Sequence, residues 1–224
     1  MFKRAHHQRI ARVLAALDSD LLQQAQCYFA GGTAIVLLLD EYRESLDIDF
    51  LCASADGYRQ LRNWVTDDLG PLQRSPLTHL RQVRADRYGI RTTLVMDGVA
   101  IKLEFVSEGR IAIEGGFDPV LQIPTLARAD MFAEKLLANA DRGLDRSTMS
   151  RDMIDLAMMI RHWGPIPQAA WAKVDLAYGA QARRAFAQAL ALIEDEAYLA
   201  ACLQKMQMDS ALLPLIRASL QASM

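Results

Sequence analysis

The chain has 224 residues, of which 52% are hydrophobic, so it can build one large domain or two small ones. Its formal net charge of −2 excludes a protein whose whole surface attracts nucleic acid. Cys27, Cys52 and Cys202 form no C-x-x-C motif, so we expect reduced thiols and no structural zinc. No stretch approaches the roughly 18 consecutive apolar residues of a membrane span. The sequence therefore predicts a soluble, cytoplasmic protein with no membrane partner.

The first half of the chain is typical of short strands that alternate with helices. We expect helices over residues 6–17, from Thr33 onward and over 56–69. Strands are expected at residues 27–29, 46–51, 78–84, 89–97 and 99–106. Asp97-Gly98 favours a tight turn because both of its residues can take positive φ, and the last two strands should form an antiparallel hairpin.

After Ile123-Pro124 the sequence is typical of helix almost throughout, with main segments at residues 131–140, 151–163, 181–205 and 210–221. Pro165 and Pro167 interrupt this run, and Pro214 belongs to the first turns of the last helix or kinks it. We therefore predict an α+β fold. A mixed sheet flanked by helices forms the domain over residues 1–123, and a helical domain follows over residues 124–224.

Asp47 and Asp49 alternate with large aliphatic residues in the segment LDIDFL. Alternate residues of a strand share a face, which puts the two carboxylates about 6.5–7 Å apart along the backbone. Such like charges repel unless a cation lies between them. Magnesium uses one or two carboxylates and keeps coordination positions for substrate phosphates. We therefore predict that Asp47 and Asp49 bind Mg²⁺ or Mn²⁺.

Gly31-Gly32-Thr33 follows one apolar strand and opens an apolar segment of helical length. The backbone N–H groups at a helix start bind anions, and the missing side chains allow a phosphate to come close. The Thr33 hydroxyl adds a further donor. Each motif alone is weak, since an ordinary turn explains the glycines, but acids on an inner strand lack a structural reason. Together the motifs predict a site for a metal-bound triphosphate.

Glu104 is the leading candidate for a third carboxylate. In VAIKLEFV the apolar residues form one face, which leaves Lys102 and Glu104 on the other face. A third acid helps to hold a second metal ion and to activate an attacking hydroxyl. The alternative is a solvent-facing Lys-x-Glu on an edge strand.

The pattern G-G-T…R-x-S-x-D-x-D resembles the first motif of the nucleotidyltransferase superfamily. More narrowly, GGTAIVLLLDEYRESLDIDF resembles the AbiEii/AbiGii toxins of type IV toxin-antitoxin systems, which include the MenT-like tRNA nucleotidyltransferases. The later family pattern of Lys, Arg and R-D-x-x-D is matched in order by Lys135, Arg142, Arg151, Asp152 and Asp155. The resemblance covers about residues 28–160.

The resemblance implies a nucleotidyltransferase fold and an enzyme that transfers a nucleoside monophosphate from an NTP and releases pyrophosphate. It also implies a tRNA 3′ end as acceptor and a cognate antitoxin as partner. Nucleotide binding is expected of Arg43, Ser45, Lys135, Arg142 and Arg151. Asp152 or Asp155 would serve as a base or a structural anchor, with Asp155 slightly favoured. At this point Glu104, Asp152 and Asp155 all remain candidates to complete the site.

Seven arginines and three aspartates lie between Arg59 and Arg91. This excess of positive charge is typical of a solvated surface or of a track for RNA or nucleotide phosphates. These arginines are the local feature that favours RNA, over a small molecule or a protein, as the acceptor of the nucleoside monophosphate. The alternatives are a nucleotidyltransferase that modifies a small molecule or a protein, or a non-catalytic nucleotide-binding module.

Overall fold

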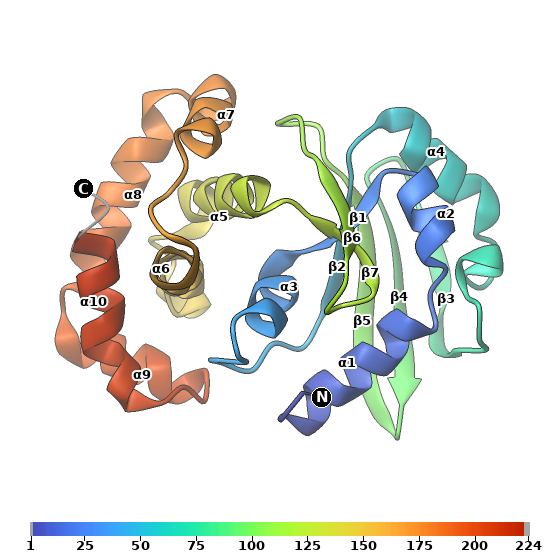
Figure 1. Ribbon diagram of the computed structural model, residues 1–224, viewed down its shortest axis with the longest axis horizontal. Helices are drawn as coiled ribbons and strands as arrows, with labels where there is room; N and C mark the ends of the chain where they lie inside the picture. Colours follow the sequence, from blue (N-terminus) through green and yellow to red (C-terminus); the bar gives the residue numbers. More distant parts are fainter. Residues whose placement is uncertain (1, 222–224) are drawn as a thin grey trace. The chain divides into compact units, whose positions relative to one another are not determined.

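Residues 2–221 are described by a computed structural model, in which the chain forms two units (Figure 1). Unit 1 comprises Met1–Leu38 and Ser45–Ala127, and unit 2 comprises Leu39–Glu44 and Arg128–Met224. The boundary therefore lies at Ala127 rather than at the expected residue 123, because the last strand of the sheet continues to Leu126. The short segment Leu39–Glu44 belongs to unit 2 although it comes from the first half of the chain.

Unit 1 is built on a seven-stranded sheet of order β3-β4-β5-β2-β1-β7-β6. Its strands are β1 Cys27–Ala30, β2 Ile48–Cys52, β3 Thr78–Ala85, β4 Gly89–Met96, β5 Val99–Ser107, β6 Gly115–Asp118 and β7 Ile123–Leu126. The pairs β2–β5 and β1–β7 are parallel and the others are antiparallel, so the predicted mixed sheet is confirmed. The sequence did not predict β6 and β7, whose Gly and Pro residues are depleted in strands.

The predicted hairpin between β4 and β5 is confirmed. Met96 pairs with Val99, and the turn residues Asp97 and Gly98 have φ angles of 51° and 75°. Positive φ at both central residues matches the turn type that the Asp-Gly dipeptide favours.

The helices of unit 1 are α1 Ala5–Ala15, α2 Ser19–Gln24, α3 Gly31–Leu38 and α4 Ala55–Trp64. The unpredicted helix α2 is capped by Asp18, whose side chain accepts a hydrogen bond from the Leu21 N–H, and Ser54 caps α4 in the same way. Helix α4 ends at Trp64, before the expected residue 69, because Val65 is already extended.

One face of the sheet forms the apolar core of unit 1. Phe29, Phe50 and Phe105 are register partners on β1, β2 and β5, and all three are fully buried. The ring centroids of Phe50 and Phe105 are 5.0 Å apart, in a stacked arrangement. Because side chains alternate along each strand, Asp49 and Glu104 point to the opposite face of the sheet.

Unit 2 is helical, with α5 Arg128–Arg142, α6 Arg151–Trp163, α7 Gln168–Tyr178, α8 Ala180–Ile193, α9 Glu196–Lys205 and α10 Leu213–Gln221. The helix expected over residues 181–205 is divided because the Asp195 side chain caps α9 through the Tyr198 N–H. Pro214 lies in the first turn of α10, as predicted. None of the helices within residues 2–221 combines the length and the apolar character that a membrane span requires. Cys27, Cys52 and Cys202 are buried free thiols.

Candidate active site

Gly31 joins β1 to α3 in a left-handed conformation, with φ at 71°. A Cβ atom at this position would lie 2.7 Å from Asp49 Oδ2, closer than real side-chain carbons approach an oxygen. The glycine therefore allows the Asp49 carboxylate to rest against the turn, and half-buried Gly32 follows in the first turn of α3. A phosphate at this turn would face the negative charge of Asp49 and would need a cation beside it.

Asp49 lies between two register partners, Ala30 on β1 and Glu104 on the parallel strand β5. Because opposite residues of neighbouring strands share a face, Glu104 stands directly beside Asp49. Asp47 precedes the first residue of β2 and is exposed, whereas Asp49 is half-buried. The structure thus places Asp49 and Glu104 side by side, with Asp47 two residues before Asp49 in the chain.

Glu104 is held by two cations. Lys102 Nζ lies 2.9 Å from Glu104 Oε1, and Arg91 Nε lies 3.3 Å from the same oxygen. The hydrogen bond to Glu104 raises the pKa of Lys102, and the charges of Glu104, Asp47 and Asp49 raise it further. The alternative of an edge-strand acid is excluded because β5 lies between β4 and β2.

Lys102 and Arg91 were not predicted as site residues. The signal for Lys102 was its position two residues before Glu104, which places both side chains on the same face of β5. The position of Arg91 depends on the pairing of β4 with β5, which sequence spacing alone does not give.

Thr33 and Ser45 bind each other and the segment that leads into the acids. The Thr33 hydroxyl donates to the Asp47 carbonyl oxygen at 2.5 Å and lies 2.8 Å from Ser45 Oγ. Since the Thr33 proton goes to Asp47, the Ser45 hydroxyl donates to Thr33. The Ser45 N–H donates to Nε2 of buried His7, at 3.1 Å. Both hydroxyl protons are therefore used to hold residues 45–47 against α3.

Two of the acids of unit 1, Asp47 and Asp49, are of the kind that can bind a magnesium ion. Asp47 and Asp49 could supply the pair of carboxylates that magnesium uses when substrate phosphates complete its coordination. Across residues 2–221 there is no group of three or more His, Cys, Asp or Glu side chains that could hold a metal ion. Glu104 is instead engaged by Lys102 and Arg91.

Asp155 on α6 is the fully buried centre of a charge network in unit 2. Arg43 donates to its two carboxylate oxygens, from Nε to Oδ1 at 2.7 Å and from Nη2 to Oδ2 at 2.8 Å. The Tyr42 hydroxyl donates to Oδ1 at 2.5 Å, and Lys135 Nζ lies 2.6 Å from Oδ2. A carboxylate with both oxygens engaged in this way suits an anchor better than a base.

Asp152 holds two of the cations of α5, Lys135 and Arg142. Lys135 Nζ donates to Asp152 Oδ1 at 2.9 Å, and Arg142 donates from Nε to Oδ2 at 2.7 Å and from Nη2 to Oδ1 at 3.0 Å. Asp152 is 2% exposed, whereas the Arg142 side chain is 41% exposed. Lys135 thus bridges Asp152 and Asp155, which lie three residues apart on one face of α6.

The cations keep both aspartates ionised. Burial by itself would raise the pKa of Asp155, but the charges of Arg43 and Lys135 outweigh it and lower the pKa. Lys135 and Arg142 lower the pKa of Asp152 against the same effect of burial. The network therefore sets three positive side chains against two carboxylates, and part of the excess charge lies on half-exposed Arg142.

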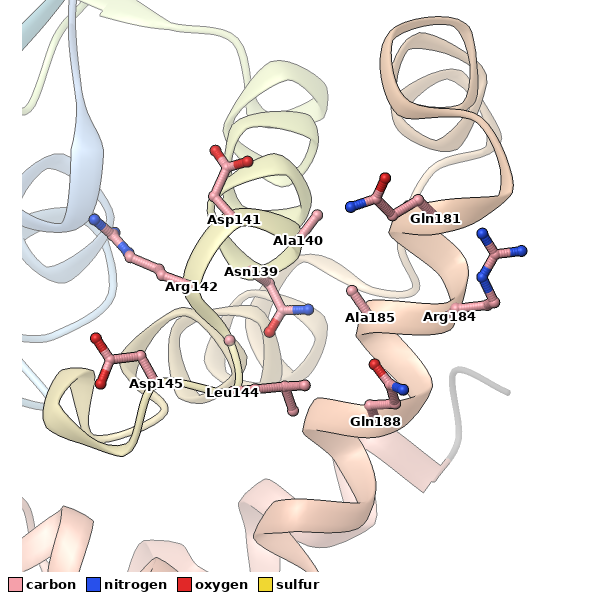
Figure 2. A pocket seen from close by; sticks show the side chains of 11 residues that line it. Asn139, Ala140, Asp141, Arg142, Leu144, Asp145, Gln181, Arg184, Ala185 and Gln188 are labelled. Carbon is pink, nitrogen blue, oxygen red and sulfur yellow. The ribbon is translucent and has the colours of Figure 1, made fainter.

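A cavity of about 340 Å³ lies where the end of α5 faces α8 (Figure 2). It is lined by unit 2 residues alone, and Arg142 is the predicted site residue among them. The Arg142 side chain points away from α8, whereas Asn139 points toward it. Arg151 starts α6, and its exposed side chain makes no ion pair within the described part of the chain. The cavity is therefore distinct from the three acids of unit 1.

Known proteins resemble this chain in family pattern and in fold. The family model of the nucleotidyl transferase AbiEii toxin, type IV TA system, matches residues 12–220. A candidate nucleotidyltransferase from H. pylori is similar in structure, with a TM-score of 0.54 and 13% identity over 96% of this chain and 92% of that one. JHP933 from Helicobacter pylori is also similar in structure, with a TM-score of 0.53 and 13% identity over 99% of this chain and 93% of that one. No curated protein matches the chain.

An antigenic nucleotidyltransferase-like protein from Paracoccidioides brasiliensis is also similar, with a TM-score of 0.50 and 16% identity over 94% of this chain and 97% of that one. At these identities the solved structures show the fold alone, and they confirm the predicted nucleotidyltransferase fold. The family match includes the glycine turn, the acids and the R-D-x-x-D segment. The chain belongs to the AbiEii family, the nucleotidyltransferase toxins of type IV toxin-antitoxin systems.

Proposed function

We propose that this enzyme transfers a nucleoside monophosphate from an NTP to the 3′ end of a tRNA and releases pyrophosphate, in a reaction that requires Mg²⁺ or Mn²⁺. The observation that carries the proposal is the position of Asp49. It has Glu104 as its register partner, Asp47 two residues before it, and the Gly31 turn against its carboxylate. Carboxylates beside a glycine turn at a helix start suit a metal-bound triphosphate.

Asp47 and Asp49 would hold the metal, which supplies positive charge for the triphosphate and for the leaving pyrophosphate. Gly31 and Gly32 let a phosphate approach the backbone at the start of α3. Thr33 and Ser45 are positioning residues, since both of their hydroxyl protons are used within the segment that carries Asp47.

In the proposed reaction the acceptor hydroxyl oxygen attacks the α-phosphorus in line. A new P–O bond forms as the bond to the bridging oxygen breaks, and pyrophosphate leaves. Glu104 takes the hydroxyl proton because its carboxylate stands beside Asp49, and Lys102 and Arg91 orient it. Asp155 is unsuited to this role because its two oxygens already accept from Arg43.

For unit 2 we propose that Lys135, Arg142 and Arg151 bind nucleotide phosphates. Asp152 and Asp155 fix Lys135 by two ion pairs, at 2.9 and 2.6 Å, and so limit the rotamer entropy that phosphate binding would cost. The family resemblance puts Arg43 in the active site. We propose that Arg43 contributes to the site through its ion pair with Asp155.

The toxin-antitoxin family implies a cognate antitoxin as the partner of this chain. We place the enzyme in the cytoplasm, where NTP and tRNA are both present.

The proposal is tested by incubating the purified protein with each of the four α-³²P-labelled NTPs and total deacylated tRNA, with Mg²⁺ or with EDTA. We expect label on the tRNA with at least one NTP and only with the metal. Asp49→Asn should lose this transfer while its urea unfolding curve stays close to that of the wild type. Absence of transfer to tRNA with all four NTPs would overturn the tRNA-directed proposal.

Three other functions would give different results, two of them in the same assay and the third in a test of toxicity in cells. Label on a small hydroxyl compound or on a polypeptide, with none on RNA, would identify a nucleotidyltransferase with another acceptor. If Asp49→Ala were as toxic in cells as the wild type, toxicity would not depend on transfer, and a non-catalytic nucleotide-binding module would be favoured.

A further inference from the structure

The edge strand β3 carries Arg81 and Arg84 on one face of the sheet. Arg81 pairs with Thr93 of β4 and Arg84 pairs with Arg91, and the register shifts between the two pairs. The two arginines are three residues apart, so plain alternation would put them on opposite faces. The bulge absorbs the extra residue and turns both toward the same face.

These arginines continue the row of candidate acids across the sheet. Reading from β3 through β4 and β5 to β2, Arg84 pairs with Arg91, Arg91 with Glu104, and Glu104 with Asp49 (Figure 1). Register partners share a face, and neighbouring strands lie about 4.8 Å apart, so the row spans about 14 Å. The row begins with Arg84 on the edge strand β3 and Arg91 on β4, and it ends at the acids Glu104 and Asp49.

A second row runs beside the first. Arg81 pairs with Thr93, and Thr93 pairs with Lys102 of β5, whose charge interacts with Asp47 and Asp49. We name the four cations of these rows, Arg81, Arg84, Arg91 and Lys102, the basic surface.

The basic surface lies on the open side of these strands. Arg81 and Arg84 are exposed, and the side chains of Arg91 and Lys102 are 42% and 52% exposed. The other side of β4 and β5 packs into the core of unit 1 through Ile90, Leu94, Ile101, Leu103 and Phe105, each no more than 1% exposed.

The cations at the edge strand carry unneutralised charge. Arg91 is shared between Asp86 and Glu104, and Lys102 pairs with Glu104. By contrast, the ion pairs found among residues 2–221 include neither Arg81 nor Arg84. Guanidinium groups in this position are suited to bind phosphate oxygens in pairs.

We infer that the basic surface binds the phosphodiester backbone of the acceptor RNA and directs its 3′ end toward Asp49. This inference rests on the proposed transfer to RNA. The positive charge increases with distance from the acids, so a polyanion is attracted along β3 and β4 while its end reaches β2. A protein partner with acidic side chains would match the charge of the basic surface. Such a partner would not need these cations to be in register with Glu104 and Asp49.

The test compares two double variants that lose the same charge. Arg81→Ala/Arg84→Ala removes the two unpaired cations of β3, and Arg59→Ala/Arg62→Ala removes two exposed arginines of α4, outside the strands of this surface. Binding of fluorescently labelled total deacylated tRNA is measured against salt concentration, and transfer kinetics are measured with the same tRNA.

For Arg81→Ala/Arg84→Ala we expect tRNA affinity to fall by about tenfold and the slope of log K against log salt to decrease by about 2, one for each lost phosphate contact. In transfer, KM for tRNA should rise while KM for NTP stays the same. The Arg59→Ala/Arg62→Ala protein should bind tRNA with nearly the wild-type salt slope.

The outcomes separate this inference from the proposed function. If the wild type transfers label to tRNA and Arg81→Ala/Arg84→Ala binds tRNA with unchanged affinity and salt slope, the inference is overturned and the proposed function stands. An equal loss of binding in both double variants would also overturn it, since the effect would then be non-specific charge. If the wild type labels no RNA, both are overturned.

Discussion

Arg43 and Asp155 form a bidentate ion pair inside unit 2, with N···O distances of 2.7 and 2.8 Å, although 112 positions separate them in the sequence. Their side chains are 7% and 0% exposed. Arg43 belongs to the segment Leu39–Glu44, which continues directly into Ser45 and the two aspartates of unit 1. The pair therefore anchors in unit 2 the segment that leads into those acids.

Asp155→Asn should destabilise the protein by about 3–5 kcal/mol, because it leaves Arg43 and Lys135 as buried charges without their common partner. Urea unfolding measures this change. The matched control is Asp175→Asn, which breaks the exposed bidentate pair with Arg183 and should cost no more than about 1 kcal/mol. Equal costs for the two variants would show that the buried network contributes no more than a surface pair.

The same network predicts how stability depends on pH. The pKa of Asp155 is lowered below its ordinary value of 3.8 in the folded protein, so the unfolded state binds a proton first as the pH falls. The stability that Asp155 provides is therefore complete above about pH 5 and is lost progressively below it. The difference in unfolding free energy between wild type and Asp155→Asn should be constant from pH 7 to 5 and narrow toward pH 3. A constant difference over the whole range would contradict the assigned direction.

Gly31→Ala should reduce transfer about a hundredfold, because the new Cβ atom would displace the Asp49 carboxylate from its position. The control is Gly98→Ala. Gly98 has a similar φ of 75°, but a Cβ atom there would meet nothing within 4 Å. Both variants should lose similar stability from the left-handed backbone, about 1 kcal/mol. Only Gly31→Ala should lose activity, as measured by kcat for transfer at saturating NTP.

Glu104→Gln should lower kcat by about 10²–10⁴-fold, as expected for loss of a general base, while KM for NTP changes little. Glu194→Gln, an exposed substitution at the end of α8, serves as the control and should behave as the wild type. An unchanged kcat for Glu104→Gln would remove Glu104 from the proposed mechanism.

Local pattern was sufficient where the physical cause is local. Alternation in LDIDFL and VAIKLEFV correctly assigned the polar and apolar faces of β2 and β5, and the Asp-Gly turn was confirmed. Local pattern was insufficient for α2, β6 and β7, which are short segments stabilised by capping or by pairing with a distant strand. It also missed the break between α8 and α9, because an apolar helical pattern continues across the Asp195 cap.

The sequence by itself determined the family, the mixed α+β architecture and the common face of the candidate acids, since each depends on residue spacing along one strand or one motif. Only the tertiary structure decided that Glu104 stands beside Asp49, that Arg81 and Arg84 share the face of these acids, and that Arg43 pairs with Asp155. These relationships depend on strand register, on a bulge and on contacts between residues far apart in the chain. Spacing along the sequence does not specify them, because they arise only when the separate segments pack together.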